Sequence, residues 1–134
     1  MGREAGWWIA VAPPLTQPAV FFDRDGVLVE YVEYLSRLEQ MRIRPCAGAA
    51  FSRLKSAGFL TVVVTNQPMV ARGQLKEKDL LQMHHWLERQ LKSQGEAWDE
   101  IYYCPHTPPP LVTRGGSAAH APPGYDAQYV RECD

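Results

Sequence analysis

The sequence lacks most features that mark an exported, membrane-bound or nucleic-acid-binding protein. Its 134 residues carry a net charge of −1 and no dense run of lysine and arginine, which disfavours a polyanionic partner. No apolar stretch approaches the length of a bilayer span, and the run at residues 7–12 is too short for a signal-peptide core. Three cysteines cannot all pair with each other, so a disulfide framework is not expected. We therefore expect a cytoplasmic monomer with no nucleic-acid or membrane partner.

The length and composition are those of one domain. With 46% hydrophobic residues, the chain can bury a single core. Residues 1–18 contain three prolines and no periodic pattern, so we interpret them as an N-terminal extension. Residues 19–134 form the predicted domain, and its last part, residues 104–134, is a long loop rich in proline and glycine.

Apolar periodicity divides the domain into alternating strands and helices. Strands are expected near residues 18–22, 59–64 and 101–103, and helices over residues 45–57 and 76–94. This order is typical of parallel strands joined by right-handed crossovers. We therefore expect an α/β fold with a Rossmann-like parallel sheet flanked by helices, in which the second strand is buried on both faces.

Some residues of the helical segments are expected to be structural. We place His84 and His85 at solvated positions of the second helix and assign them no chemistry. Cys46, just before the first helix, is interpreted as a small buried residue. The inward stripe of the second helix consists of Leu80, Met83, Leu87 and Leu91.

Two aspartates follow the first strand. Asp23 and Asp25 are two positions apart, so their side chains share a face of an extended segment, and Gly26 lets the backbone turn directly afterwards. Ligands of parallel sheets collect where the strands end, so both carboxylates are expected to point into one site. Phosphoryl transfer through an aspartate needs a carboxylate nucleophile, a second acid and a divalent cation. These aspartates meet the first two needs and offer oxygen ligands for Mg²⁺.

The end of the second strand strengthens this interpretation. The Thr65 hydroxyl and nearby backbone N–H groups can donate hydrogen bonds to phosphate oxygens. Two acids at this spacing are by themselves more typical of a surface turn. The apolar strand that precedes them, together with Thr65, Asn66 and Gln67 after the next strand, favours a phosphate site instead.

Together these motifs resemble the haloacid dehalogenase phosphatase superfamily. The resemblance lies in residues 22–27, 62–67 and 71–73, and residues 101–106 narrow it to one branch. That branch contains D-glycero-D-manno-heptose 1,7-bisphosphate 7-phosphatase and histidinol-phosphate phosphatase. The resemblance is good over residues 19–106 and weaker beyond them. It implies a Mg²⁺-dependent phosphatase that hydrolyses a small phosphorylated metabolite, a sugar phosphate, through an aspartyl-phosphate.

The resemblance also implies roles for individual residues. Asp23 would be the nucleophile, Asp25 the general acid and then the base, and both would contribute to the Mg²⁺ site. Thr65 would stabilise the transferring phosphoryl group, with Asn66 and Gln67 lining the substrate site beside it.

For two further parts of the sequence, the resemblance implies a functional role, whereas the residues alone indicate a surface position. The stretch from Tyr31 to Tyr34 would contact substrate in the family, but taken alone it is a surface turn. Arg72 would act on the substrate side or in a conformational change, or it is a solvated arginine before Gly73.

The cysteines suggest a second metal. Cys104 and His106 alternate along a segment stiffened by Pro105, so both side chains can face one tetrahedral ion. In the family such a pair is completed by a Cys-x-Cys pair that forms a structural Zn²⁺ site, and Cys133 matches its first half. A fourth ligand is missing from the sequence, and the surroundings of His120 give it no support as a substitute. The alternative is a buried Cys104 and a surface His106.

The family also uses a third-motif lysine or arginine and a fourth-motif acid, and no residue of this sequence stands in those contexts. We therefore expect a C-terminally truncated domain with an incomplete sheet. Two alternatives to the sugar phosphatase stay open. A polynucleotide 3'-phosphatase shares Thr-Asn-Gln and Arg-Gly, although the neutral charge and the Cys-x-His pair argue against it. The other alternative is an inactive fragment that acts only as a binding module.

Overall fold

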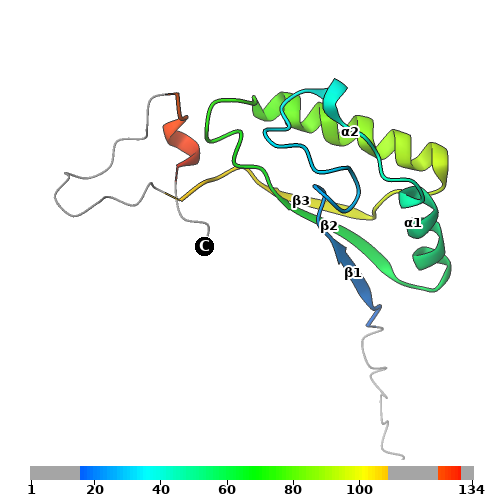
Figure 1. The fold of residues 1–134 in the computed structure, drawn as a ribbon. Coiled ribbons are helices and arrows are strands. Elements are labelled where there is room, and N and C mark those ends of the chain that lie inside the picture. Colours follow the sequence, from blue (N-terminus) through cyan, green and yellow to red (C-terminus); the bar gives the residue numbers. More distant parts are fainter. Residues whose placement is uncertain (1–15, 109–123, 131–134) are drawn as a thin grey trace, which may run out of the picture.

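The computed structural model describes residues 16–108 and 124–130. Three parallel strands, β1 (Ala19–Phe22), β2 (Leu60–Asn66) and β3 (Glu100–Cys104), form one sheet in the order β1-β2-β3. Helix α1 (Ala47–Ser56) connects β1 to β2, and helix α2 (Glu77–Gln94) connects β2 to β3 (Figure 1). The predicted parallel α/β fold is therefore confirmed. Two short 3₁₀ turns, Leu38–Gln40 and Ala127–Tyr129, were not predicted.

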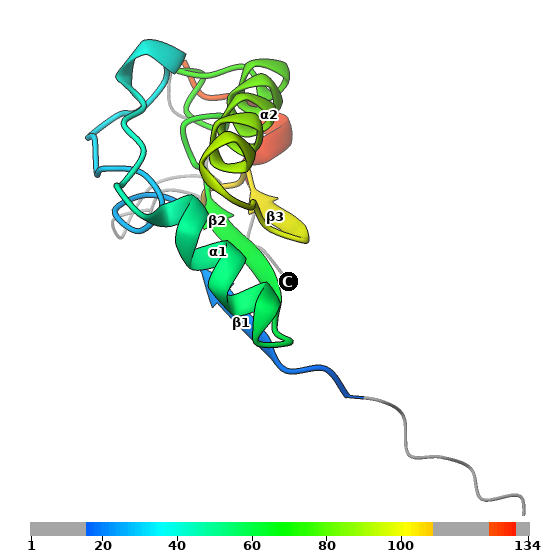
Figure 2. The ribbon, with the colours of Figure 1, turned by 90° about the vertical axis from the view of Figure 1, so that its right-hand side faces the viewer.

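Both helices pack on the same face of the sheet, which we call the covered face (Figures 1 and 2). Side chains alternate along each strand, so every second residue points into the core beneath the helices. Phe22 of β1 contacts Phe51 of α1, with ring centroids 5.0 Å apart. The predicted stripe of α2 lies in the same core. Its members are the buried residues Leu80, Met83, Leu87 and Leu91.

The helices approach each other closely at Gly48. A Cβ atom at this position would lie 2.6 Å from the carbonyl oxygen of Leu91, which is too close for any side chain. Glycine therefore allows α1 to pack against the last turns of α2. Helix α2 begins with two acids, Glu77 and Asp79, whose charge favours a helix N-terminus.

The opposite face of the sheet, which we call the open face, is not covered by the described residues as the sequence predicted. The second strand was expected to be buried on both faces, but Val64 is 49% exposed and Leu60 is also exposed. Phe21 on β1 is 68% exposed, and Tyr102 on β3 is exposed as well. The apolar run of β2 predicts a strand correctly, but a run of apolar residues does not show whether helices cover one face or two.

Two further predictions concern Cys46 and membrane-spanning helices. Cys46 is exposed rather than buried, because it precedes α1 with a left-handed backbone (φ 70°) that turns its side chain out of the core. Neither helix of the described segments combines the length and the hydropathy that a bilayer crossing requires.

Candidate active site

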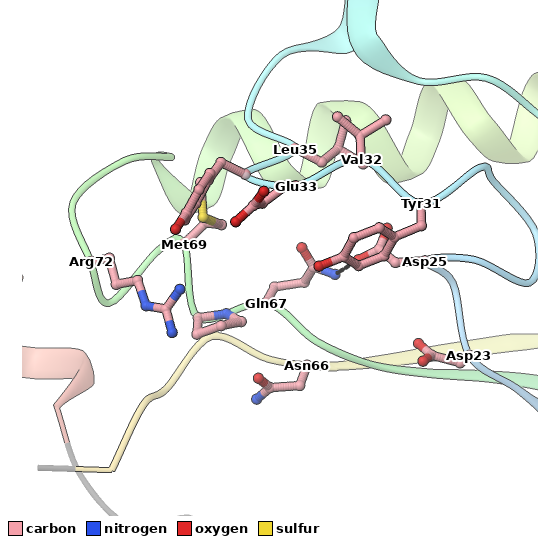
Figure 3. Close-up of a pocket in the computed structure, with 12 residues that line it drawn as sticks. Asp23, Asp25, Tyr31, Val32, Glu33, Leu35, Asn66, Gln67, Met69 and Arg72 are labelled. Atoms are coloured by element: carbon pink, nitrogen blue, oxygen red, sulfur yellow. Dashed lines mark hydrogen bonds between the residues drawn. The ribbon is translucent and has the colours of Figure 1, made fainter. Parts of the chain in front are cut away.

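A pocket of about 420 Å³ opens at the carboxyl edge of the sheet. It lies where the chain leaves β1 and β2, as the sequence predicts for ligands of a parallel sheet. Figure 3 shows the side chains of the two strand ends on one side and those of the loop after the first turn on the other. The lining residues are Asp23, Asp25, Tyr31, Val32, Glu33, Tyr34, Leu35, Asn66, Gln67, Pro68, Met69 and Arg72.

Asp23, the first residue after β1, has an exposed carboxylate. Its Oδ1 accepts a hydrogen bond from the backbone N–H of Arg24 at 2.7 Å. This bond orients the carboxylate while leaving it accessible from the pocket. An oriented, accessible carboxylate is suited to act as a nucleophile or as a cation ligand.

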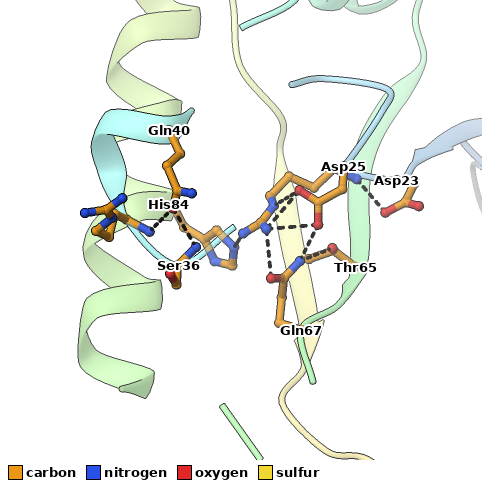
Figure 4. Close-up of polar contacts among 9 residues, drawn as sticks. Asp23, Asp25, Ser36, Gln40, Thr65, Gln67 and His84 are labelled. Atoms are coloured by element: carbon orange, nitrogen blue, oxygen red, sulfur yellow. Dashed lines mark hydrogen bonds and ion pairs between the residues drawn. The ribbon is translucent and has the colours of Figure 1, made fainter. Parts of the chain in front are cut away.

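Asp25 has a different environment, because it forms an ion pair with its own neighbour. The Arg24 side chain is fully buried, and its Nε and Nη2 donate to the two carboxylate oxygens of Asp25 at 2.9 and 3.0 Å (Figure 4). The turn that follows brings Gly26 N to the carbonyl of Val29 at 2.8 Å, with Gly26 at φ 79°. Glycine is suited to this left-handed position, as the sequence indicated.

Gln67 joins the two strand ends. Its Oε1 accepts from Arg24 Nη2 at 2.8 Å, and its Nε2 donates to Asp25 Oδ2 at 2.9 Å and to Thr65 Oγ1 at 2.8 Å. All the hydrogen-bonding groups of the amide face a partner, which fixes its orientation. Gln67 is thus both a pocket residue and the link between Asp25 and Thr65.

His84 corrects a third prediction, since it is only 4% exposed rather than solvated. Its Nε2 lies 3.2 Å from Arg24 Nη1, and because a guanidinium can only donate, the imidazole nitrogen is the acceptor. Burial, and then the positive charge of Arg24, lower the pKa of His84 to about 4. The imidazole is therefore neutral at pH 7. Burial likewise lowers the pKa of Arg24, while the charge of Asp25 acts in the opposite direction.

Thr65 lies behind the residues that line the pocket and is buried on the covered face. Its hydroxyl oxygen accepts the hydrogen bond of Gln67, so its own hydrogen is available for another acceptor. Asn66, the next residue, points to the open side and lines the pocket (Figure 3).

The loop after the first turn closes the other side of the pocket. Tyr31 and Tyr34 are exposed lining residues, and Tyr34 has a left-handed backbone with φ 57°. Arg72 lines the end of the pocket away from Asp23, and its buried Nε has no hydrogen-bond partner within the described segments (Figure 3). The structure thus brings Tyr31, Tyr34 and Arg72 to the same pocket as the aspartates.

Two of the predicted zinc ligands, Cys104 and His106, lie at the end of β3 and just beyond it. Cys104 Sγ lies 3.5 Å from His106 Nδ1. No group of three potential metal ligands occurs among the residues that the structure describes, and Cys133 and His120 lie outside them.

Tyr129 anchors the chain where it returns to this segment. Its hydroxyl donates to Glu77 at 2.6 Å, and its ring lies 5.9 Å from that of His106. Glu77 also accepts from Tyr103 at 2.8 Å. Burial, followed by this hydrogen bond, raises the pKa of Tyr103 to about 12. Residues 127–130 are thereby held beside the end of β3.

Sequence reasoning missed Arg24 and His84. A signal for His84 was present, because it lies four residues after Leu80 and three before Leu87, on the inward stripe of α2. Arg24 follows the alternation of β1, in which Phe22 points inward and Asp23 outward. Both periodicities predict burial, although the residue types suggest exposure.

Comparisons with known proteins agree with this geometry. No family model matches the chain. It is 39% identical to a D-glycero-β-D-manno-heptose-1,7-bisphosphate 7-phosphatase of Rhodopseudomonas palustris over 90 residues, which are 67% of this chain and 50% of that protein. It is 33% identical to a phosphatase of the same name from Vibrio cholerae over 120 residues, which are 90% of this chain and 57% of that protein.

A solved structure gives the same result for the fold. The D,D-heptose 1,7-bisphosphate phosphatase of B. bronchiseptica, complexed with magnesium and phosphate, matches with a TM-score of 0.64 and 29% sequence identity. The match covers 68% of this chain and 51% of that one. The chain therefore spans about half the length of the relatives it matches. Its motifs, its parallel sheet and these similarities show that the chain belongs to the haloacid dehalogenase superfamily of phosphatases.

Proposed function

We propose that the chain carries the nucleophile and the general acid of a Mg²⁺-dependent phosphatase that hydrolyses a small sugar phosphate, such as a heptose 1,7-bisphosphate. One observation carries the proposal: the exposed carboxylate of Asp23 and the immobilised carboxylate of Asp25 line the same pocket. Two neighbouring acids in different environments are suited to different roles in one reaction. The names of the relatives support the substrate class.

The two carboxylates divide the chemistry between them. Asp23 attacks the phosphorus atom and the bond from phosphorus to the ester oxygen breaks. Asp25, after binding a proton from solvent, gives that proton to the departing alkoxide. In the second step Asp25 takes a proton from the water that attacks the aspartyl-phosphate, which releases phosphate and restores Asp23. Thr65, Asn66 and Gln67 lie beside the transferring group in this scheme, and Tyr31 and Tyr34 face the rest of the substrate.

The donor set at the strand ends fits Mg²⁺. Asp23 offers an accessible carboxylate, and Asp25 offers a carbonyl or carboxylate oxygen, which are the hard ligands that this ion takes together with water. When bound, the ion would neutralise negative charge on the phosphoryl group.

The test is phosphate release by the 134-residue chain in the presence of Mg²⁺. A heptose 1,7-bisphosphate, histidinol phosphate and an oligonucleotide 3'-phosphate would be compared as substrates, and the heptose ester is expected to turn over fastest. Asp23→Asn should lower the rate more than about 100-fold, because the nucleophile is lost. Asp126→Asn, which changes an exposed aspartate away from the pocket, is the matched control. Equal rates for Asp23→Asn and the parent chain, or no release from any of the three esters, would refute the proposal.

We also propose that the protein acts as a cytoplasmic monomer. A further proposal is that Cys104 and His106, with Cys133, hold a structural Zn²⁺. The distance of 3.5 Å from Sγ to Nδ1 supports the metal site. Two ligands of one tetrahedral Zn²⁺, at the usual Zn–S and Zn–N distances, lie roughly 3.5 Å apart. Tyr129 and the parallel bridge from Thr107 to Val130 bring the chain back beside this pair shortly before Cys133.

Zinc content tests this site. Protein purified and dialysed against trace Zn²⁺ is expected to retain about one equivalent by mass spectrometry, and Cys104→Ala should lose it. Cys46→Ala is the matched control, because Cys46 is exposed beside α1. Retention of zinc by Cys104→Ala would contradict the assignment.

A further inference from the structure

Asp25 belongs to a network with three buried side chains that neither the fold nor the proposed chemistry explains. We call Arg24, Gln67 and His84 the Asp25 clamp. Arg24 comes from the segment after β1, Gln67 from the segment after β2, and His84 from the middle of α2. Arg24 and Gln67 donate hydrogen bonds to the Asp25 carboxylate, and His84 contacts Arg24 (Figure 4). Each is buried, with an exposed fraction of at most 4%.

The clamp fixes the plane of the Asp25 carboxylate. A short acidic side chain beside a glycine turn has several rotamers open to it, and the Asp25 side chain is still 25% exposed. The planar fork of Arg24 engages both oxygens, and the Gln67 amide adds a third bond to Oδ2 at 2.9 Å. Forked pairs of this kind impose orientation as well as attraction. The observed rotamer of Asp25 accepts all three hydrogen bonds.

His84 supports the clamp indirectly, through Arg24. The Nη1 group of the buried guanidinium faces the imidazole Nε2 at 3.2 Å. The imidazole is itself packed edge-on against Tyr103, with ring centroids 5.6 Å apart. A buried charge needs such partners, because an unpaired one is costly. Arg24 is therefore held on two sides, by Asp25 and Gln67 on one and by His84 on the other.

We propose that the Asp25 clamp is a positioning device: Arg24 and Gln67 hold Asp25 in the single rotamer that faces the pocket, and His84 holds Arg24. The proposal rests on the proposed role of Asp25 as general acid. The rotamer itself can be measured without turnover, so the clamp and the function can fail separately. The competing explanation is that the network only stabilises the fold.

The first experiment measures the Asp25 rotamer in solution. Three-bond NMR couplings from the backbone nitrogen and carbonyl carbon to Asp25 Cγ report χ1 in the isotope-labelled chain. The parent chain is expected to show one rotamer, and Gln67→Leu and Arg24→Met should show averaged couplings while the rest of the spectrum stays folded. Arg24→Lys keeps the charge without the fork and should give an intermediate result. This variant also serves if Arg24→Met does not fold.

The matched control is Asn66→Leu, which changes the neighbouring amide residue on the same strand end. Asn66 donates to the carbonyl of Cys104 at 3.4 Å and does not contact Asp25. Its substitution should leave the Asp25 couplings unchanged. Averaged couplings in the parent chain, or a single Asp25 rotamer in folded Gln67→Leu and Arg24→Lys, would overturn the proposal.

The second experiment separates positioning from general stability by the leaving group. An alkoxide needs the proton of Asp25, whereas p-nitrophenolate leaves without one. The first-turnover rate of Asp23 phosphorylation by a sugar phosphate should fall about 100-fold in Gln67→Leu, because a small misplacement of an acid has effects of that size. The rate with p-nitrophenyl phosphate should fall less than about 10-fold, because its leaving group does not need the proton of Asp25. Equal losses with both esters would mean a structural role and overturn the proposal. If the parent chain phosphorylates with neither ester, the proposed function fails and the couplings alone decide the clamp.

Discussion

The two faces of the sheet differ in what lies against them, and the candidate site uses both. On the covered face Phe22 packs against α1, while on the open face its neighbour Phe21 is largely exposed. The same alternation continues past the ends of the strands. Asp23 and Asn66 point to the open side, whereas Arg24 and Gln67 are buried on the covered side. The groups that would meet a substrate and those that hold them in place are therefore neighbours in sequence.

This division explains how two aspartates two residues apart can take different roles. Asp23 faces water and is oriented by a single backbone hydrogen bond. Asp25 lines the pocket too, but its carboxylate is held by three hydrogen bonds from two buried side chains. A nucleophile benefits from access, and a proton donor benefits from a fixed position. The environment, rather than the residue type, separates the two.

The largest expected effect contrasts the adjacent phenylalanines of β1. Phe22→Ala should lower the free energy of unfolding by about 3–5 kcal/mol, because it removes the ring that packs on Phe51. Phe21→Ala should change it by less than about 1 kcal/mol, since most of that ring already lies in solvent. Urea unfolding followed by circular dichroism compares the two variants directly. Similar losses would mean that something covers the open face in solution, and the contrast between the faces would not hold.

The sequence predicts the fold better than it predicts the surroundings of the site. The order of strands and helices follows from apolar periodicity, and the strands extend beyond their apolar runs because backbone pairing continues through Thr65, Asn66 and Cys104. The pocket at the strand ends follows from the same order. The apolar periodicity of α2 also predicts that His84 is buried. Because histidine is polar and the helix carries many charged residues, its residue type nevertheless favours a solvent-exposed position.

The role of Arg24 could not be predicted from its neighbours alone. An arginine between two acids is usually a solvated residue that balances their charge. Its burial depends on Gln67, which is 43 residues away, and on His84, which is 60 residues away. The packing of α2 against the sheet brings His84 to the guanidinium, and the end of β2 brings Gln67. Polar networks assembled from three elements leave little local signal in any one of them.

A smaller effect is expected from pH, and it originates on the covered face. His84 has an ordinary pKa of 6.5 and a pKa of about 4 in the folded chain. Between these values the unfolded chain binds a proton that the folded chain does not, so stability falls as the pH is lowered through this window. The slope contributed by one such group is about 1.4 kcal/mol per pH unit. Urea unfolding at pH 6 and pH 5 measures this slope.

The neighbouring histidine supplies the control that assigns the slope to His84. His84→Phe should flatten the stability difference between pH 6 and pH 5, while His85→Phe, on the exposed side of α2, should leave it unchanged. The pKa values of Glu77 and Asp99 are also lowered, from 4.5 and 3.8. The main cause is the hydrogen bond with Tyr129 for Glu77 and the hydrogen bond with the backbone of Thr61 for Asp99. Their stabilisation is present above those values and is lost only at lower pH. A slope that survives in His84→Phe would mean that His84 takes up a proton in the folded chain, which its place beside Arg24 opposes.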